Sequence, residues 1–297
     1  FLASLPRPFL WGPVGGGETA PDGFASSFSR RGRIYELLRD IGRWVGEHDP
    51  FVRRTARRAA MTLASTAETA DRIRRINGDR PVEVCPAIGV TDDELSLYRN
   101  LPERSDNRLR IVSIGRFLHW KGFHLGLEAF AQSGIENCEY WLIGDGPERD
   151  RLMELARSLG IEKSVTFTGN IPRSEVLQQL ADCDMLVHPS LHESGGGVCL
   201  EAMAAKIPVI ALDLGGPAQH HRDGAGVLVE AGEPTRTTQK LAAAMRDLAA
   251  SPERRSAIAE EGHRRLLASY LWPAKARHYG SIYRSLLDRP EYAGAVR

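Results

Sequence analysis

From residue 109 onward, short apolar runs alternate with amphipathic stretches, and this alternation restricts the possible folds more than any other feature of the chain. Alternating strands and helices build a parallel sheet with helices on both faces, and the buried strands of such a sheet are continuously apolar. Strands are predicted at 111–114, 140–143, 165–167, 185–187, 208–212 and 227–229. Helices are predicted at 122–132, 147–158, 173–181, 198–205 and 217–222. The sequence therefore predicts an α/β fold.

The first hundred residues are patterned differently, so we expect a separate structural unit there. Residues 9–22 are rich in Gly and Pro and predict a loop, whereas apolar residues recur at helical spacing over 33–46. Further helices are predicted at 51–60 and 66–76, with strands at 61–64 and 82–85. The segment 91–107 is polar and weakly patterned. We place a boundary there, which gives three parts: 1–107, 108–270 and 271–297.

Composition excludes several classes of protein. The chain has 39 basic and 38 acidic residues, and a net charge near zero argues against a dedicated nucleic-acid-binding protein. No apolar run approaches the ~18 residues of a membrane-spanning helix. The four cysteines are scattered, which is typical of reduced core residues in a cytoplasmic protein. The chain begins at Phe1 without the order of a signal peptide, so we expect a further N-terminal portion before it.

A basic segment lies between Arg30 and Arg58. It holds nine arginines and four acidic residues, a local excess of five positive charges. A solvated basic face is the favoured interpretation. The alternative is peripheral contact with the anionic inner face of a membrane, which salt would abolish.

Glycine-rich or polar segments follow the predicted strands. In an open parallel sheet, ligands bind beyond the carboxyl ends of the strands, so these segments meet at one edge. They are Gly115-Arg116, Gly144–Pro147, Thr168–Pro172, His192–Gly197 and Asp213–Gly216. We therefore expect a single ligand site at this edge.

The residues at that edge favour a ligand with a diphosphate. Three glycines, Gly195–Gly197, directly precede a predicted helix, whose N-terminus offers free N–H groups and a positive dipole end. Arg116 and Lys121 add two positive charges from another loop. Taken singly, the glycines could form a simple turn and each cation could be a solvated surface charge. Their shared location favours the site.

Two carboxylates flank the glycines. Glu193 precedes the predicted helix and Glu201 lies about one turn inside it, so both can reach one ligand. Carboxylates beside an anion site suit the hydroxyls of a ribose or hexose. The alternative for Glu201 is stabilisation by the helix dipole, worth roughly 0.3–1 kcal/mol.

These motifs carry a resemblance to a known family. They are Gly115-Arg116 with Lys121-Gly122, the pair Glu193-x7-Glu201, and the run Leu200–Ala204 followed by Pro208–Ile210. Over 108–230 the chain resembles the donor half of glycosyltransferase family 4, a group of retaining glycosyltransferases with the GT-B fold. The resemblance implies a Rossmann-like donor domain and the remaining part of a second Rossmann-like domain. It also implies that the C-terminal helix packs back toward the first domain.

The resemblance implies roles for individual residues. Arg116 and Lys121 would bind the donor diphosphate and Glu193 the transferred sugar, and these three form the expected catalytic set. Glu201 would hold the ribose. The further substrate-binding residues that it implies are Gly115, Gly169, Asn170, Ile171, Ser194, Gly195, Gly196, Gly197 and Leu200. It implies a nucleotide-diphosphate sugar as donor, a glycan, lipid or small-molecule acceptor, and neither a metal nor a cofactor.

Other functions stay open at this stage. A nicotinamide-dependent oxidoreductase needs G-x-G-x-x-G, and the two candidate segments end in Arg149 and Leu200 instead of the third glycine. A donor-binding subunit without activity is the second alternative. The donor carrier could be UDP or GDP.

Three further signals are weaker. Asp182-Cys183-Asp184 resembles a metal-binding Asp-x-Asp, but it precedes a predicted strand and so belongs to the opposite sheet edge. His220-His221 is predicted to be a surface pair. Ser194 stands where many family members have Gly, which could alter the contacts with the sugar.

Overall fold

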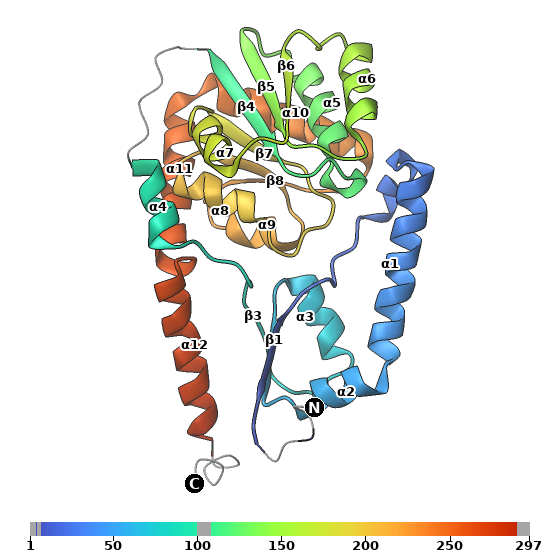
Figure 1. Cartoon of the computed structure of the whole chain (residues 1–297), viewed down its shortest axis with the longest axis vertical. Helices are drawn as coiled ribbons and strands as arrows, with labels where there is room; N and C mark the ends of the chain where they lie inside the picture. Colours follow the sequence, from blue (N-terminus) through green and yellow to red (C-terminus); the bar gives the residue numbers. More distant parts are fainter. Residues whose placement is uncertain (1–3, 5–6, 100–107, 290–297) are drawn as a thin grey trace.

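A computed structural model of the chain describes residue 4 and residues 7–99 and 108–289. These residues form two parallel sheets (Figure 1). The larger sheet has the strand order β6-β5-β4-β7-β8-β9. Its strands are β4 (Leu109–Ile114), β5 (Cys138–Ile143), β6 (Val165–Gly169), β7 (Met185–His188), β8 (Val209–Leu212) and β9 (Val227–Val229). The predicted alternation is confirmed strand by strand.

Helices cover both faces of the larger sheet, because its buried strands present apolar side chains on each side. Ile111 and Val112 are neighbours in β4 and both are fully buried, yet they belong to the cores on opposite faces. One face carries α5 (Phe123–Ser133), α6 (Arg149–Ser158) and α10 (Pro234–Ala250). The other carries α7 (Arg173–Ala181) and α8 (Gly197–Ala204), with α9 (Gly215–His220) and α11 (Pro252–Ser269) beside them.

The smaller sheet consists of β1 (Leu10–Val14), β2 (Met61–Ala64) and β3 (Val82–Val84), all parallel. The sequence predicts a loop over 9–22, so β1 is a correction. Leu10 pairs with Met61 some fifty residues away, and this long-range pairing overrides the local glycine and proline signal. The helices of this part are α1 (Arg30–His48), α2 (Pro50–Arg58) and α3 (Ala67–Arg74), with a short 3-10 helix at Asp22–Ser27.

Two further helices complete the described fold. The C-terminal helix α12 (Trp272–Leu287) runs beside the smaller sheet (Figure 1), where Ile282 and Leu286 pack against Leu63 and Cys85. The helix α4 (Asp92–Arg99) occupies part of the segment for which the sequence predicts no clear pattern. The remaining residues of that segment, 100–107, lie outside the described residues.

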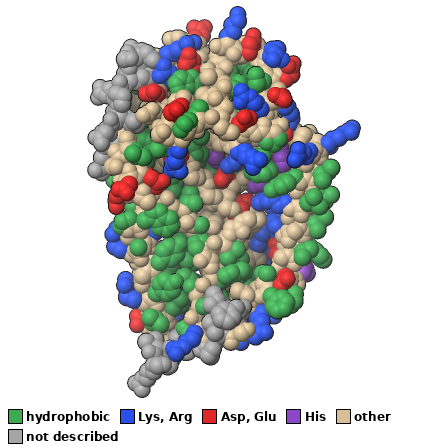
Figure 2. Space-filling model, in the orientation of Figure 1, with side chains coloured by type: hydrophobic (Ala, Val, Ile, Leu, Met, Phe, Trp, Pro, Cys, Tyr) green, Lys and Arg blue, Asp and Glu red, His purple; other side chains and the backbone are tan. Residues whose placement is uncertain are grey.

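The amphipathic helix α1 turns its charged face inward and its apolar face outward. The side chains of Glu36 and Arg43 are only 14% and 10% exposed, whereas Leu38 and Trp44 are 62% and 61% exposed. Hydrophobic side chains accordingly line the outer edge that α1 forms in Figure 2. An amphipathic helix normally buries its apolar stripe, so this orientation leaves an unusual exposed surface.

None of the helices that the structure describes is both long and apolar enough to cross a lipid bilayer. All four cysteines are buried, as the sequence predicts.

Candidate active site

Lys121 and Glu193 form an ion pair at the carboxyl edge of the larger sheet. Lys121 ends a short 3-10 turn after β4, and Glu193 follows β7, the neighbouring strand. Both side chains are 19% exposed. Gly122, at φ +68°, lets the turn approach closely, since a Cβ there would lie 1.9 Å from the carbonyl oxygen of Pro189. The two residues that the sequence places in one site are thus in direct contact.

Further partners hold the Glu193 carboxylate. The Ser190 hydroxyl donates to Oε2 at 3.4 Å and the backbone N–H of Gly196 donates to Oε1 at 3.3 Å. The Nε2 atom of His188 lies 3.5 Å from Oε2. Burial would raise the pKa of Glu193, but the attraction of His188 and Lys121 outweighs it and holds that pKa well below its usual range. Glu193 is therefore ionised at neutral pH.

The glycine segment forms the start of α8, as predicted. Gly196 is the N-terminal cap with φ +73°, and a Cβ on it would lie 2.9 Å from the Pro217 side chain. The N–H groups at the start of an α-helix have no intrahelical acceptor, so they are available to an anionic ligand. The His220 ring lies 2.6 Å from the carbonyl oxygen of Gly195 and fixes this segment from behind.

The burial of His220 and His221 corrects the expectation of a surface pair. They are 0% and 1% exposed. Burial lowers the pKa of His220 to about 4 and that of His221 to about 3, so both rings are neutral at pH 7. The helix α9 has only six residues, too few for its polar pattern to indicate which side faces the core.

Arg116 and Gly115 follow β4 at the same sheet edge. Arg116 is exposed. Gly115 has φ +149°, and its carbonyl oxygen would lie 2.1 Å from a Cβ on Gly144, so the loops after β4 and β5 are in close contact.

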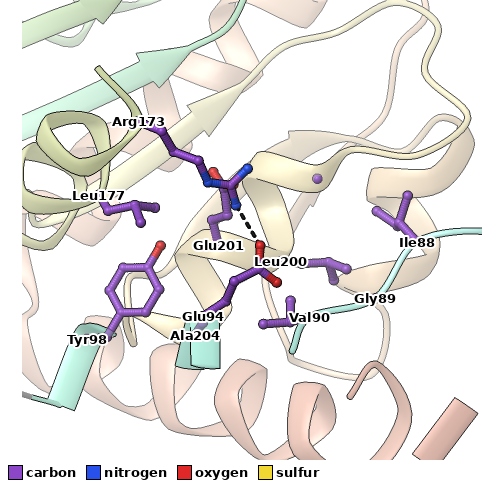
Figure 3. Close-up of a pocket in the computed structure, with 11 residues that line it drawn as sticks. Ile88, Gly89, Val90, Glu94, Tyr98, Arg173, Leu177, Leu200, Glu201 and Ala204 are labelled. Carbon is purple, nitrogen blue, oxygen red and sulfur yellow. Dashed lines mark hydrogen bonds and ion pairs between the residues drawn. The ribbon is translucent and has the colours of Figure 1, made fainter. Parts of the chain in front are cut away.

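Glu201 lines a pocket beside α8 (Figure 3). Arg173 bridges two carboxylates there, with Nη2 lying 2.8 Å from Glu94 Oε1 and 2.9 Å from Glu201 Oε1. Burial raises the pKa of Glu201, although the Arg173 charge opposes the shift. The other lining residues are Ile88, Gly89, Val90, Tyr98, Leu177, Gly197, Leu200 and Ala204. Leu200, Gly197 and Glu201 are thus brought together as the sequence predicts.

The contribution of α4 to this pocket was not predicted from the sequence. Glu94 and Tyr98 lie on α4, and the buried Tyr98 hydroxyl has no hydrogen-bond partner among the described residues. One signal was available, because Thr91-x-x-Glu94 is a capping box that marks the start of a helix. The Glu94 carboxylate accepts from the Thr91 backbone N–H at 2.9 Å, and the Glu94 N–H donates to the Thr91 hydroxyl at 3.1 Å.

The remaining predicted binding residues follow β6. Gly169 has φ +72°, and its carbonyl oxygen accepts from the Gly144 N–H at 3.1 Å. Asn170 is exposed, and Ile171 packs against the core beneath α7 and α8. Among the described residues that line the Glu201 pocket, none belongs to this group. The three residues share the sheet edge with the site without entering that pocket.

The N-terminal part also contacts the site, which no local pattern could indicate. The Ser194 hydroxyl donates to Glu18 Oε2 at 2.5 Å and accepts from the Gly16 N–H at 3.1 Å. Hydrogen bonds from Ser194, Thr66 and Thr69 outweigh the effect of burial and lower the pKa of Glu18. Ser194 therefore joins the carboxyl edge of the larger sheet to a buried, ionised carboxylate of the N-terminal part.

No cluster of three or more potential metal ligands occurs within residues 7–99 and 108–289. Asp184 precedes β7, at the opposite sheet edge from Glu193, and its carboxylate accepts from the Arg110 N–H at 2.8 Å. Its position matches the expectation from the sequence.

Comparison with known families decides the classification. The profile of the family "glycosyl transferases group 1" matches residues 98–265, more than half of the chain. The chain belongs to this family. The matched region contains Arg116, Lys121, Glu193 and Glu201.

Relatives of known name belong to the same class. The chain is 31% identical over 209 residues to the lipopolysaccharide core biosynthesis glycosyltransferase LpsE of Rhizobium meliloti, covering 70% of this chain and 59% of that protein. It is 28% identical over 266 residues to the alpha-D-kanosaminyltransferase of Streptomyces kanamyceticus, covering 85% of this chain and 66% of that one. The chain thus spans less than two thirds of either relative.

Solved structures share the fold. Anabaena HepE, determined in complex with UDP and glucose, superposes with a TM-score of 0.67 at 21% identity, covering 94% of this chain and 72% of HepE. Sucrose-phosphate synthase from Thermosynechococcus elongatus gives a TM-score of 0.65 at 23% identity, covering 89% of this chain and 66% of the synthase. The fold of this family member is therefore GT-B, with two Rossmann-like α/β parts.

Proposed function

We propose that this chain forms the donor side of a retaining glycosyltransferase that uses a UDP- or GDP-sugar and transfers the sugar to a hydroxyl of a glycan, lipid or small-molecule acceptor. One observation carries the proposal. The Lys121–Glu193 pair lies at the N-terminus of α8, and the Glu201 pocket lies beside the same helix. Cation, free amides and carboxylates thus lie along one ligand path.

The charges of this path suit a nucleotide-diphosphate sugar. Lys121 and Arg116 would contact the diphosphate, with the first amides of α8 beside them. Glu193 is ionised and would accept hydrogen bonds from sugar hydroxyls. Burial raises the pKa of Glu201, and this residue would accept hydrogen bonds from the ribose hydroxyls. Since side chains and amides supply the positive charge, the proposal requires neither a metal nor a cofactor.

The reaction breaks the bond between the anomeric carbon and the diphosphate oxygen and forms a bond to the acceptor oxygen. Negative charge develops on the departing diphosphate, where preorganised cations stabilise the transition state. In a retaining displacement the acceptor oxygen attacks from the face that the diphosphate leaves, and a diphosphate oxygen takes the acceptor proton. No separate base is then needed.

We also propose the division into an N-terminal part (1–107), a donor domain (108–270) and a C-terminal helix (271–297). It is supported by the two separate sheets and by the packing of α12 on the smaller one. The acceptor site would belong largely to the N-terminal side.

Calorimetry tests the donor site. UDP, GDP, ADP and NAD are titrated in EDTA into the wild-type chain, Arg116→Ala and the exposed control Arg246→Ala. Binding of UDP or GDP that Arg116→Ala weakens and Arg246→Ala leaves unchanged is expected. Binding of NAD alone would replace the proposal with an oxidoreductase. A requirement for added Mg²⁺ would contradict the metal-free site, and binding of no nucleotide would refute the donor site in this chain.

The exposed surface of α1 favours a second property, peripheral contact with an anionic membrane. Its apolar side chains face outward, and exposed arginines lie at both ends of the segment. These exposed arginines are Arg30, Arg31, Arg33, Arg54, Arg57 and Arg58. Apolar insertion combined with anionic lipid attraction is typical of an interfacial helix.

Vesicle sedimentation tests this contact. The chain should bind vesicles that contain phosphatidylglycerol at low salt, and not vesicles of phosphatidylcholine alone. Replacing Leu38 and Trp44 by serine should abolish binding, while Tyr283→Ser, at a position on α12 that is 54% exposed, should not. Absence of binding to anionic vesicles at low salt refutes the proposal.

A further inference from the structure

One carboxylate of α1 links the two loops that carry Lys121 and Glu193. Glu36 Oε1 lies 2.8 Å from His119 Nε2 and 3.1 Å from His192 Nε2. His119 is two residues before Lys121, and His192 directly precedes Glu193. A single oxygen atom thus joins the loop after β4 to the loop after β7.

The surrounding rings are packed around this link. Trp120 stacks on His192, with ring centroids 5.2 Å apart and an interplanar angle of 17°. Its other stacking partner is Tyr35 of α1, at 4.9 Å and 13°. Gly32 is the buried residue of α1, and a Cβ there would lie 2.9 Å from the His119 ring. The close approach of α1 to both loops is therefore a specific feature of the packing.

The link is a charged one. Burial would raise the pKa of Glu36, but hydrogen bonds from His119 and His192 outweigh it and lower the pKa to about 2. Burial lowers the pKa of His192. Because the ionised Glu36 carboxylate can only accept, the ring donates to it from Nε2. Arg39 lies 3.7 Å from the other oxygen of Glu36. Breaking these bonds would leave a half-buried carboxylate without its donors, which is costly.

The two loops are also held by the Lys121–Glu193 ion pair itself. A nucleotide-diphosphate sugar would separate that pair, since Lys121 would turn to the phosphate and Glu193 to the sugar. The loops then need a connection that does not pass through the ligand. Glu36 supplies one that involves neither residue.

We propose that Glu36 is a positioning residue that keeps the Lys121 loop and the Glu193 loop in register when the donor separates their ion pair. The inference rests on the proposed donor site, because Lys121 and Glu193 owe their roles to it. Glu36 itself contacts neither residue, and its effect passes through His119 and His192.

The test compares Glu36→Ala with Glu36→Gln and with Asp40→Ala. Glutamine keeps an oxygen that can accept from both rings, whereas alanine removes it. Asp40 is an acidic residue of the same helix whose partner is Arg43, so its replacement controls for lost charge on α1. Circular dichroism establishes that each variant is folded. If Glu36→Ala does not fold, Glu36→Gln is the variant that is compared with the wild type.

Two readouts are measured. Hydrogen exchange of peptides spanning 116–122 and 190–197 should increase in Glu36→Ala without nucleotide, and should stay near wild type in the other two variants. The Kd for UDP should rise about tenfold in Glu36→Ala, since misplaced groups lose contact with the β-phosphate, while the Kd for UMP stays within about twofold. GDP and GMP replace these probes if the wild-type chain binds guanine nucleotides.

The outcomes separate this inference from the proposed function. Unchanged exchange of both loops in Glu36→Ala overturns the inference, even if nucleotides bind. Equal weakening of UDP and UMP overturns it too, because a general loss of structure would then be the cause. A Glu36→Gln variant as loose as Glu36→Ala refutes the hydrogen-bond link. If hydrogen exchange of the two loops increases in Glu36→Ala but the wild-type chain binds no nucleotide, the link through Glu36 is supported and the donor site is refuted.

Discussion

The two glutamates beside α8 have opposite electrostatic surroundings. Glu193 is held by Lys121, Ser190, the Gly196 amide and the nearby His188, and its pKa is lowered. Glu201 pairs with the exposed Arg173, but burial raises its pKa and the nearby charge of Glu94 adds to that effect. Both residues are of the same type and lie along one helix start, so the difference comes from the partners that the fold supplies.

The comparison shows how one ligand path can combine two kinds of carboxylate. A preorganised charge, such as Glu193, costs little rearrangement when the charge distribution of the ligand changes. A carboxylate such as Glu201 stabilises the ligand less, because burial penalises its own charged form. We therefore expect variants of the Glu193 end to have larger effects than variants of the Glu201 end.

The largest effect is expected for Lys121→Ala. It removes the cation that would contact the diphosphate and leaves Glu193 without its nearest charge. Losing a charge-assisted hydrogen bond costs about 1.5–3 kcal/mol, so the Kd for UDP should rise about 10- to 100-fold. Calorimetry measures it, with Lys206→Ala as control, because Lys206 pairs with Glu260 on the exposed surface. An unchanged Kd would place the diphosphate elsewhere.

Glu201→Gln should have a smaller effect on the nucleotide. The amide keeps one acceptor oxygen and loses the charge, so the Kd for UDP should rise only about three- to tenfold. The fold should stay nearly intact, since the side chain lies at the pocket wall and not in the core. Calorimetry and a thermal melt measure the two properties. Collapse of the domain with unchanged affinity would mean that Glu201 is structural.

A third prediction concerns stability against pH. The pKa of Glu193 is lower in the folded chain than its usual value of 4.5, so its stabilisation is present above pH 4.5 and is lost as pH falls further. Glu193→Gln should therefore have a lower Tm than the wild type at pH 7, by about 2–4 °C for each kcal/mol of unfolding free energy that is lost. This difference in Tm should shrink below pH 4.5. Thermal melts at pH 7, 5 and 4 measure it.

The sign is reversed for Glu201. Its pKa is raised on folding, so the ionised form is penalised at pH 7 and acidification relieves the penalty. Glu201→Gln should thus match or exceed the wild-type Tm at pH 7, and the gain should disappear at pH 4. A Glu201→Gln deficit as large as that of Glu193→Gln would contradict the difference between the two sites.

The hydrophobic pattern of the sequence predicted the helices and strands of the larger sheet, because these elements depend on neighbouring residues. The bounds of α7 and β9 follow the sequence closely, because helical periodicity and a short apolar run mark them. The meeting of Lys121 with Glu193 was predictable as well, since the carboxyl ends of adjacent parallel strands share an edge.

Contacts between distant segments were not predictable. The hydrogen bond from Ser194 to Glu18 spans 176 residues, and Glu36 meets His192 over a separation of 156. No periodicity in the sequence encodes which remote side chain covers a loop. The outward apolar face of α1 was not predictable either, because an amphipathic pattern predicts that the apolar stripe is the buried one.

The smallest effect is expected for Arg173→Ala. Its guanidinium is 63% exposed and bridges Glu94 and Glu201 at the mouth of the pocket. Solvent screens such a pair, so its removal should change the unfolding free energy by about 0–1 kcal/mol. Without Arg173 the pKa of Glu201 should rise further, because burial then acts unopposed. Carbon-13 NMR of the glutamate carboxyls measures that titration, with Arg157→Ala as the surface control. A pKa of Glu201 that falls in Arg173→Ala would show that Arg173 does not stabilise its charge.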